Sequence, residues 1–206
     1  MSQCLILIGF KACGKTSVGE LLAQKLGVQF LDTDRLLEAR YASSLLPTSH
    51  DSALPTSPNS RGLTAGSIGL DTSMDLAVKP REFGCAEIYR AIGEHAFRAL
   101  EKSVMTDLQQ AATNTPRVIA TGGGVVLDPE NKALLQQLGK VIYLSASYAT
   151  LLSRLKSNSL PAFMSGDLET EFQTLFAQRE PMYREMADRV LNTENYSVLE
   201  VVEQLV

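Results

Sequence analysis

The sequence has no long apolar run, no excess of basic residues and little cysteine, and each shortage excludes a class of protein. No stretch approaches the roughly 18 apolar residues that a membrane helix needs, and no basic leader precedes the first strand-like segment. A net charge of −4 and a pI near 5.3 do not provide the basic face of a nucleic-acid-binding protein. We therefore expect small-molecule partners, with no nucleic acid and no membrane.

The cysteine content favours a reducing compartment. Cys4, Cys13 and Cys85 lack the spacing of metal ligands and cannot all pair with one another. We therefore expect a cytoplasmic protein. With 206 residues, of which 45% are hydrophobic, the chain is long enough to bury a core, and we expect a single domain over residues 1–206.

Strand-like and helix-like segments alternate along most of the chain. The expected strands are residues 4–8, 28–31, 117–121, 140–145 and 189–191. The expected helices are residues 15–26, 86–110, 131–137, 148–155, 168–184 and 198–205. This alternation predicts an α/β fold, a doubly wound five-stranded parallel sheet with helices on both faces.

Residues 43–80 interrupt this rhythm. Half of them are Ser, Thr, Pro or Gly, and none is aromatic. Such a composition buries too little apolar surface to offset chain entropy. We expect a flexible surface insertion, and a docking segment for an unknown partner is the alternative.

The clearest motif is GFKACGKT at residues 9–16, which fits the pattern G-x-x-x-x-G-K-[ST] between a strand and a helix. In such a loop the backbone N–H groups surround phosphate, the lysine reaches the β- and γ-phosphates, and the Thr hydroxyl can bind Mg²⁺. A chance match in a glycine-containing turn is the alternative. The motif predicts a nucleoside triphosphate site that contains Ala12, Cys13, Gly14, Lys15, Thr16 and Ser17.

Two acids follow the second expected strand, at the edge of the sheet where ligands of α/β proteins bind. Asp32 is placed to hold Mg²⁺ or its waters near Thr16, and Asp34 could accept a proton from an attacking hydroxyl. The alternative for Asp34 is a structural one, the cap of a helix that begins at Arg35.

Arg98 and Glu101 share one face of the helix expected over residues 86–110. Arg98 could bind a substrate carboxylate, with Glu101 orienting it and Tyr89 and Phe97 forming the walls of the pocket. An exposed salt bridge on the helix is the alternative.

Three consecutive glycines end the apolar strand of VIATGGGVV, residues 118–126. Glycines weaken a strand but let the backbone approach a ligand closely. We expect Gly122 and Gly123 to contact substrate, and a simple turn is the alternative.

Together these parts resemble the shikimate kinase family, small P-loop kinases of the nucleoside monophosphate kinase type. The matching pieces are LILIGFKACGKTSVGELLA, FLDTD, EIYRAIGEHAFRALE, VIATGGGVV and QREPMYREMAD. The resemblance implies transfer of the γ-phosphoryl group of ATP to the 3-hydroxyl of shikimate, in aromatic amino-acid biosynthesis. It further implies the cofactors ATP and Mg²⁺, the strand order 2-3-1-4-5, a mobile lid over residues 156–167 and a monomer.

The resemblance also implies roles for individual residues. Asp34 becomes the base, a catalytic residue beside Lys15, and contacts substrate hydroxyls together with Gly123. Arg98 and Arg179 are assigned to the shikimate carboxylate. Arg154 matches a position that flanks the adenine ring.

One position departs from the family pattern. The family lid carries an arginine where this chain has Leu160, and Lys11, Lys156 or Arg154 could replace its charge. Two other functions therefore stay open from the sequence: another small-molecule kinase acting on gluconate or a nucleotide, or an ATP-binding module that has lost catalysis.

Overall fold

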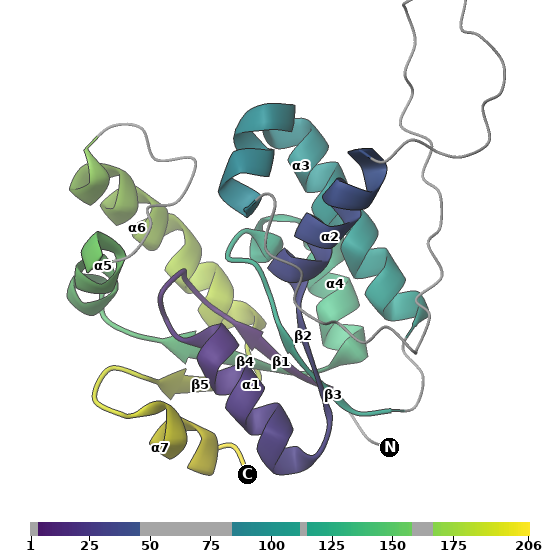
Figure 1. Ribbon diagram of the computed structural model, residues 1–206. Coiled ribbons are helices and arrows are strands. Elements are labelled where there is room, and N and C mark those ends of the chain that lie inside the picture. Colours follow the sequence, from purple (N-terminus) through teal and green to yellow (C-terminus); the bar gives the residue numbers. More distant parts are fainter. Residues whose placement is uncertain (1–3, 46–83, 112–114, 158–166) are drawn as a thin grey trace, which may run out of the picture.

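The strands form one parallel sheet in the order β2-β3-β1-β4-β5 in the computed structural model, which describes residues 4–45, 84–111, 115–157 and 167–206 (Figure 1). The predicted order is thus confirmed, and each predicted strand agrees with an observed one to within a residue at either end. The strands are β1 (Cys4–Ile8), β2 (Gln29–Asp32), β3 (Arg117–Ala120), β4 (Gly139–Ser145) and β5 (Arg189–Asn192).

The centre of the sheet is the apolar strand β1. Ile6, Leu7 and Ile8 have no exposed surface. Ile6 lies opposite Ile119 of β3 on one side and Val141 of β4 on the other. A strand whose two faces are both covered by helices must be apolar along its whole length, and for this reason CLILI shows no alternation of polar and apolar residues.

Helices cover both faces of this sheet. They are α1 (Lys15–Leu26), α2 (Thr33–Leu45), α3 (Cys85–Gln110), α4 (Pro129–Leu138), α5 (Tyr148–Ser157), α6 (Leu168–Met186) and α7 (Val198–Glu203). Figure 1 shows α1 and α7 together on one face, with α4 and α6 on the other. Right-handed crossovers require this division, because the chain runs from β1 toward one edge of the sheet and later from β3 toward the opposite edge.

Helix α2 corrects two expectations. It begins at Thr33, not Arg35, and it continues through Leu45, so residues 43–45 belong to a helix and not to the expected insertion. The two serines bond within the last turn: Ser43 Oγ donates to the Ala39 carbonyl at 2.9 Å and Ser44 Oγ to the Tyr41 carbonyl at 2.7 Å. Both hydroxyls thus find acceptors within the helix, which is a common arrangement for serine at such positions. Residues 46–80 of the expected insertion lie outside the described residues.

Helix α3 packs against α2 above the carboxyl ends of the strands (Figure 1). It has a kink at Gly93, whose φ of 77° lies in the region that glycine tolerates best. The kink separates the part of the helix that carries Tyr89 from the part that carries Phe97 and Arg98.

The ends of the expected lid, residues 156–167, belong to helices. Lys156 and Ser157 form the end of α5, and Asp167 caps α6 by accepting the backbone N–H of Thr170 at 3.2 Å. Residues 158–166, which include Leu160, lie outside the described residues. Among the described helices, none is long and apolar enough to cross a bilayer.

Candidate active site

A cavity of about 520 Å³ lies at the carboxyl ends of the strands. Its walls come from the loop after β1, the start of α2, helix α3, the glycine segment after β3, and α6. Eleven of the thirteen predicted site residues line it: Ala12, Gly14, Lys15, Thr16, Ser17, Asp32, Asp34, Arg98, Gly122, Gly123 and Arg179. The tertiary structure thus brings together residues that lie up to 167 positions apart in the sequence.

The loop of residues 9–16 wraps around the side chain of Lys15. Its Nζ donates to the carbonyl oxygens of Gly9 at 2.9 Å and Phe10 at 2.8 Å. Gly14 adopts a left-handed conformation (φ 96°) and no side chain among the described residues caps the start of α1. The backbone N–H groups in the first turn of α1 are therefore left without a side-chain acceptor. Such groups at a helix N-terminus can bind an anion.

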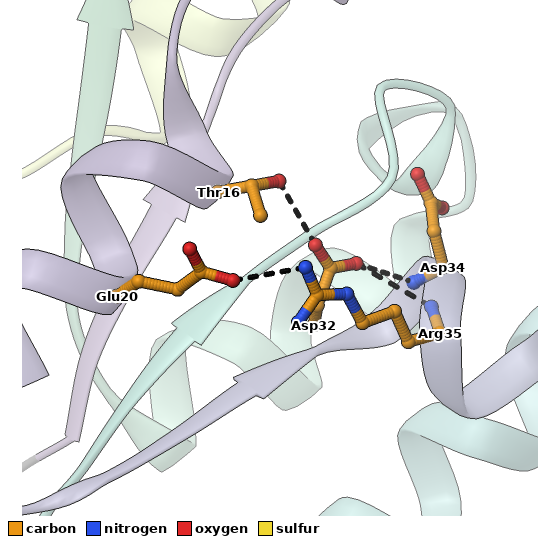
Figure 2. Close-up of polar contacts among 5 residues, drawn as sticks. All are labelled: Thr16, Glu20, Asp32, Asp34 and Arg35. Carbon is orange, nitrogen blue, oxygen red and sulfur yellow. Dashed lines mark hydrogen bonds and ion pairs between the residues drawn. The ribbon is translucent and has the colours of Figure 1, made fainter. Parts of the chain in front are cut away.

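Two oxygen donors suited to a metal lie beside this loop. Thr16 Oγ1 donates to Asp32 Oδ2 at 2.9 Å, joining the start of α1 to the end of β2 (Figure 2). Mg²⁺ is usually held by one or two protein oxygens, with phosphates and water completing an octahedron. Among the described residues no group of three or more His, Cys, Asp or Glu could hold a metal. The donor pair fits Mg²⁺ bound together with a nucleotide.

The other oxygen of Asp32 organises the start of α2. Asp32 Oδ1 accepts the backbone N–H of Asp34 at 3.0 Å and that of Arg35 at 3.4 Å (Figure 2). Asp32 is therefore the capping side chain, and the alternative in which Asp34 caps the helix is wrong. Asp34 sits in the first turn of α2, and it lines the cavity.

The environment of Asp34 makes its carboxylate more basic than usual. Burial raises the pKa of Asp34 to about 6, the negative charge of Asp32 adds to the rise, and the positive charge of Lys15 opposes it. Desolvation of a charged group is the dominant cause. A carboxyl group with a pKa near the working pH is suited to accept a proton.

The glycine segment after β3 fits closely around the charged side chains. A Cβ on Gly122 would lie 2.6 Å from Asp34 Oδ1, and a Cβ on Gly124 would overlap the guanidinium of Arg98. Val125–Leu127 then form a short 3₁₀ helix, so the strand does not resume after the glycines. A methyl group at Gly122 or Gly124 would therefore have to displace the Asp34 carboxylate or the Arg98 guanidinium.

Two arginines, Arg98 and Arg179, line the cavity and are close enough to interact electrostatically. Arg98 forms an ion pair with Glu101, and Arg179 Nη1 donates to the Gly123 carbonyl at 3.3 Å. Burial lowers the pKa of Arg179, and the positive charge of Arg98 lowers it further. Two neighbouring guanidinium groups repel each other, and a bound anion would relieve this repulsion. The planar geometry of each group also matches that of a carboxylate.

Aromatic side chains lie beside Arg98, whose Cζ is 5.7 Å from the centroid of the Phe97 ring. The rings of Tyr89 and Phe97 meet edge to face with their centroids 5.4 Å apart, and both line the cavity. They provide the apolar wall of the pocket that was expected from the sequence.

The two remaining predicted residues line a second cavity, of about 230 Å³, behind the phosphate loop. Arg154 donates to the carbonyl oxygens of Ala12 at 3.3 Å and Thr193 at 3.4 Å. Cys13 is buried there and is unpaired with any other cysteine. The half-exposed ring of Tyr196 also lines this cavity, and Tyr196 was not among the predicted site residues.

Comparison with known proteins assigns a family to this arrangement. The family model for shikimate kinase matches residues 11–46 and 70–206. The chain belongs to the shikimate kinase family. Shikimate kinases of known name are its relatives over nearly the whole chain: the one from Stenotrophomonas maltophilia is 31% identical over 204 residues, which cover 98% of this chain and 89% of that protein.

Another shikimate kinase, from Francisella tularensis subsp. holarctica, is 29% identical, and the alignment covers 98% of this chain and 91% of that protein. The same fold occurs in the structure of Acinetobacter baumannii shikimate kinase in complex with shikimate, with a TM-score of 0.72 at 24% identity, over 100% of this chain and 91% of that one. The structure of shikimate kinase from Bacteroides thetaiotaomicron gives a TM-score of 0.67 at 21% identity, and the match covers 98% of this chain and 95% of that one.

The shikimate kinase family model leaves residues 47–69 unmatched. These unmatched residues fall inside the segment 43–80, which was expected from its composition to be an insertion. The expected boundaries are wider than the gap on both sides.

Two residues that position the site were missed in the sequence. Glu38 Oε1 accepts the backbone N–H of Cys85 at 3.1 Å and so joins α2 to the start of α3. The Tyr183 hydroxyl donates to the Gly123 carbonyl. Glu38 lies one helical turn after Asp34, so it could have been expected to face the same cavity. The partner of Tyr183 lies 60 residues away, and no local pattern indicates it.

Proposed function

We propose that this protein transfers the γ-phosphoryl group of ATP to the 3-hydroxyl of shikimate, giving shikimate 3-phosphate and ADP. One observation carries the proposal: a single cavity contains the phosphate loop, the Asp34 carboxylate of raised pKa, and the two arginines Arg98 and Arg179. A phosphate donor, a proton acceptor and an anion-binding end are the parts that a kinase acting on a small hydroxy acid needs. Family membership and the relatives named shikimate kinase give independent support.

In the proposed reaction the substrate hydroxyl attacks the γ-phosphorus, its proton passes to Asp34, and the bond to the β-phosphate oxygen breaks. Lys15 and the N–H groups of residues 12–17 bind the phosphates. Bound Mg²⁺ neutralises phosphate charge, and Thr16 and Asp32 would hold it. The protein contributes position and charge more than covalent chemistry, because phosphoryl transfer needs little else.

At the acceptor end, Arg98 and Arg179 would bind the shikimate carboxylate, with Gly122 and Gly123 beside its hydroxyls. Glu101 orients Arg98, and the Gly123 carbonyl orients Arg179. Fixing the carboxylate at two guanidinium groups selects which hydroxyl meets Asp34. In the second cavity, Arg154 would flank the adenine ring.

We also propose that the protein works in the cytoplasm as a monomer. Its three cysteines are free, which agrees with a reducing compartment. The phosphate loop, Asp34 and the two arginines all line one cavity within a single chain, which agrees with a monomer. Light scattering of the purified protein tests the monomer.

An ADP-release assay coupled to NADH oxidation tests the function, with shikimate, gluconate and nucleoside monophosphates offered as acceptors. We expect turnover with shikimate, and phosphorus NMR of the product should show a phosphate on the 3-hydroxyl. Asp34→Asn is the control: it should bind ATP and turn over at least about 100-fold more slowly. Preference for gluconate or a nucleotide would replace the proposed substrate, and ATP binding without acceptor-dependent turnover would indicate an inactive module.

A further inference from the structure

Four cationic residues line the large cavity: Lys11, Lys15, Arg98 and Arg179. Three of them are bound within the protein, Lys15 to two loop carbonyls, Arg98 to a carboxylate and Arg179 to a backbone carbonyl. Lys11 is exposed, and no hydrogen bond or ion pair joins its ammonium to any residue of the described chain. It is therefore the cation of this cavity whose charge is not committed to a protein partner.

The position of Lys11 lies between the two halves of the site. The residue belongs to the phosphate loop, and its backbone N is 3.9 Å from the place where a Cβ on Gly123 would stand. Gly123 in turn is tied to α6 through Tyr183 and Arg179. Lys11 thus stands where the phosphate loop meets the glycine segment. In the function proposed above, the γ-phosphoryl group would pass between these two parts of the site.

The other cations near the phosphate loop are engaged elsewhere. Lys156 lies on the exposed side of α5, forms an ion pair with Glu169 and does not line the large cavity. Arg154 is bonded to two backbone carbonyls at the second cavity. Neither could approach the transferred group without first losing these partners.

We propose that Lys11 is a catalytic residue of this protein, whose ammonium contacts the γ-phosphoryl oxygens and stabilises the charge that develops on them during transfer. The proposal rests on the function proposed above, and it assigns to the phosphate loop itself a charge that many phosphoryl-transfer enzymes supply from a separate arginine. A flexible ammonium with no partner among the described residues can move to the oxygens as the bond to the leaving phosphate lengthens.

This role makes a specific kinetic demand. Charge stabilisation in the transition state raises kcat, whereas contacts shared by the bound nucleotide and the transition state change KM or the nucleotide affinity. Loss of Lys11 should therefore affect turnover and leave the affinity for ADP, which lacks the γ-phosphoryl group, nearly intact.

Three variants test it: Lys11→Met removes the charge at similar size, Lys11→Arg retains it, and Lys140→Met is the matched control. Lys140 is exposed near the amino end of β4, at the opposite end of the sheet from the site, and its loss changes the net charge equally. We expect Lys11→Met to lower kcat with shikimate at least about tenfold, Lys11→Arg to recover part of that loss, and Lys140→Met to match the parent protein. The Kd for ADP should change less than about twofold in all three.

A binding measurement that needs no acceptor keeps this inference separate from the proposed substrate. ADP with aluminium fluoride and Mg²⁺ imitates the transferring group, and its Kd should rise at least about tenfold in Lys11→Met while the Kd for ADP alone does not. Parent-like kcat in Lys11→Met, or an equal loss of ADP and ADP–aluminium fluoride affinity, would overturn the role of Lys11. Absence of turnover with shikimate in the parent protein, with the aluminium fluoride difference intact, would overturn only the substrate.

Discussion

The Asp32 carboxylate accepts the backbone N–H of Asp34 at 3.0 Å through one oxygen and the Thr16 hydroxyl at 2.9 Å through the other (Figure 2). One side chain therefore joins the metal-binding oxygens at the start of α1 to the turn that carries the proposed base. A substitution at Asp32 should therefore affect both the metal site and the start of α2. Variants that remove only the charge, or the charge and the hydrogen bonds together, distinguish the two contributions.

Asp32→Asn should retain the cap and lose the charge, because an amide oxygen still accepts the backbone N–H groups. We expect at least about a tenfold higher Mg²⁺ concentration for half-maximal activity. The pKa of Asp34 should also fall, since the negative charge of Asp32 raises it. A Mg²⁺ titration of the rate and the unfolding free energy against pH measure the two effects.

Asp32→Ala, which removes cap and charge together, should in addition destabilise the fold by about 1 kcal/mol. Glu20→Gln is the control: it breaks the nearby surface pair with Arg35, at 2.9 Å, without touching the oxygens of Asp32 (Figure 2). An unchanged Mg²⁺ requirement in Asp32→Asn would remove Asp32 from the metal site.

Asp34→Asn should stabilise the unliganded, metal-free protein at neutral pH. Folding raises the pKa of Asp34 from 3.8 to about 6, so the folded state binds more protons between these values and loses stability as the pH rises through them. Above pH 6 the buried charge costs about 1–3 kcal/mol. Urea unfolding of both proteins should show this gain at pH 7.5 and its disappearance near pH 4, and a less stable variant at pH 7.5 would contradict the assignment.

Gly122→Ala and Gly123→Ala should differ although they are neighbours. The methyl group on Gly122 would lie 2.6 Å from Asp34 Oδ1, whereas that on Gly123 would find its nearest atom, the Tyr183 hydroxyl, at 3.5 Å. We therefore expect Gly122→Ala to lower the melting temperature and to reduce kcat by about 100-fold through displacement of the base.

Gly123→Ala should melt like the parent protein and raise the KM for shikimate, because the added methyl group occupies space that the protein leaves to a ligand. Thermal melts and steady-state kinetics of the pair distinguish these outcomes. A parent-like KM in Gly123→Ala would show that substrate does not approach this glycine.

Ala12→Gly should stabilise the protein. Ala12 has a φ of 68°, in the left-handed region where a side chain costs about 1–2 kcal/mol. Glycine removes this cost, but its greater conformational freedom in the unfolded chain offsets part of the gain. The net increase in the free energy of unfolding should be about 0.5–1 kcal/mol. The same substitution at the exposed Ala133, in the middle of α4, should destabilise by about 1 kcal/mol, and chemical denaturation of both variants tests the opposite signs.

Local patterns predicted the elements that depend on neighbours in sequence. The apolar run CLILI, the pattern G-x-x-x-x-G-K-[ST] and the Arg98–Glu101 spacing each involve residues within one or two turns, and the structure contains the strand, the loop and the ion pair they indicate. The start of the insertion was predicted wrongly because composition suggested a flexible segment from Ser43, whereas α2 continues through Leu45. The Ser43 and Ser44 hydroxyls bond to carbonyl groups of that helix.

The sequence by itself determined that residues 9–16 carry the phosphate-loop pattern between a strand and a helix of a parallel α/β sheet, since strand, glycines, lysine and helix follow one another without a break. Only the tertiary structure decided which side chains meet in and around the cavity. Asp32 and not Asp34 caps α2, and Gly123 is tied to Tyr183. Among the described residues Lys11 has no partner, while Lys156 and Arg154 do. These relations depend on contacts between segments far apart in the chain. The burial that raises the pKa of Asp34 exists only once those segments have packed together.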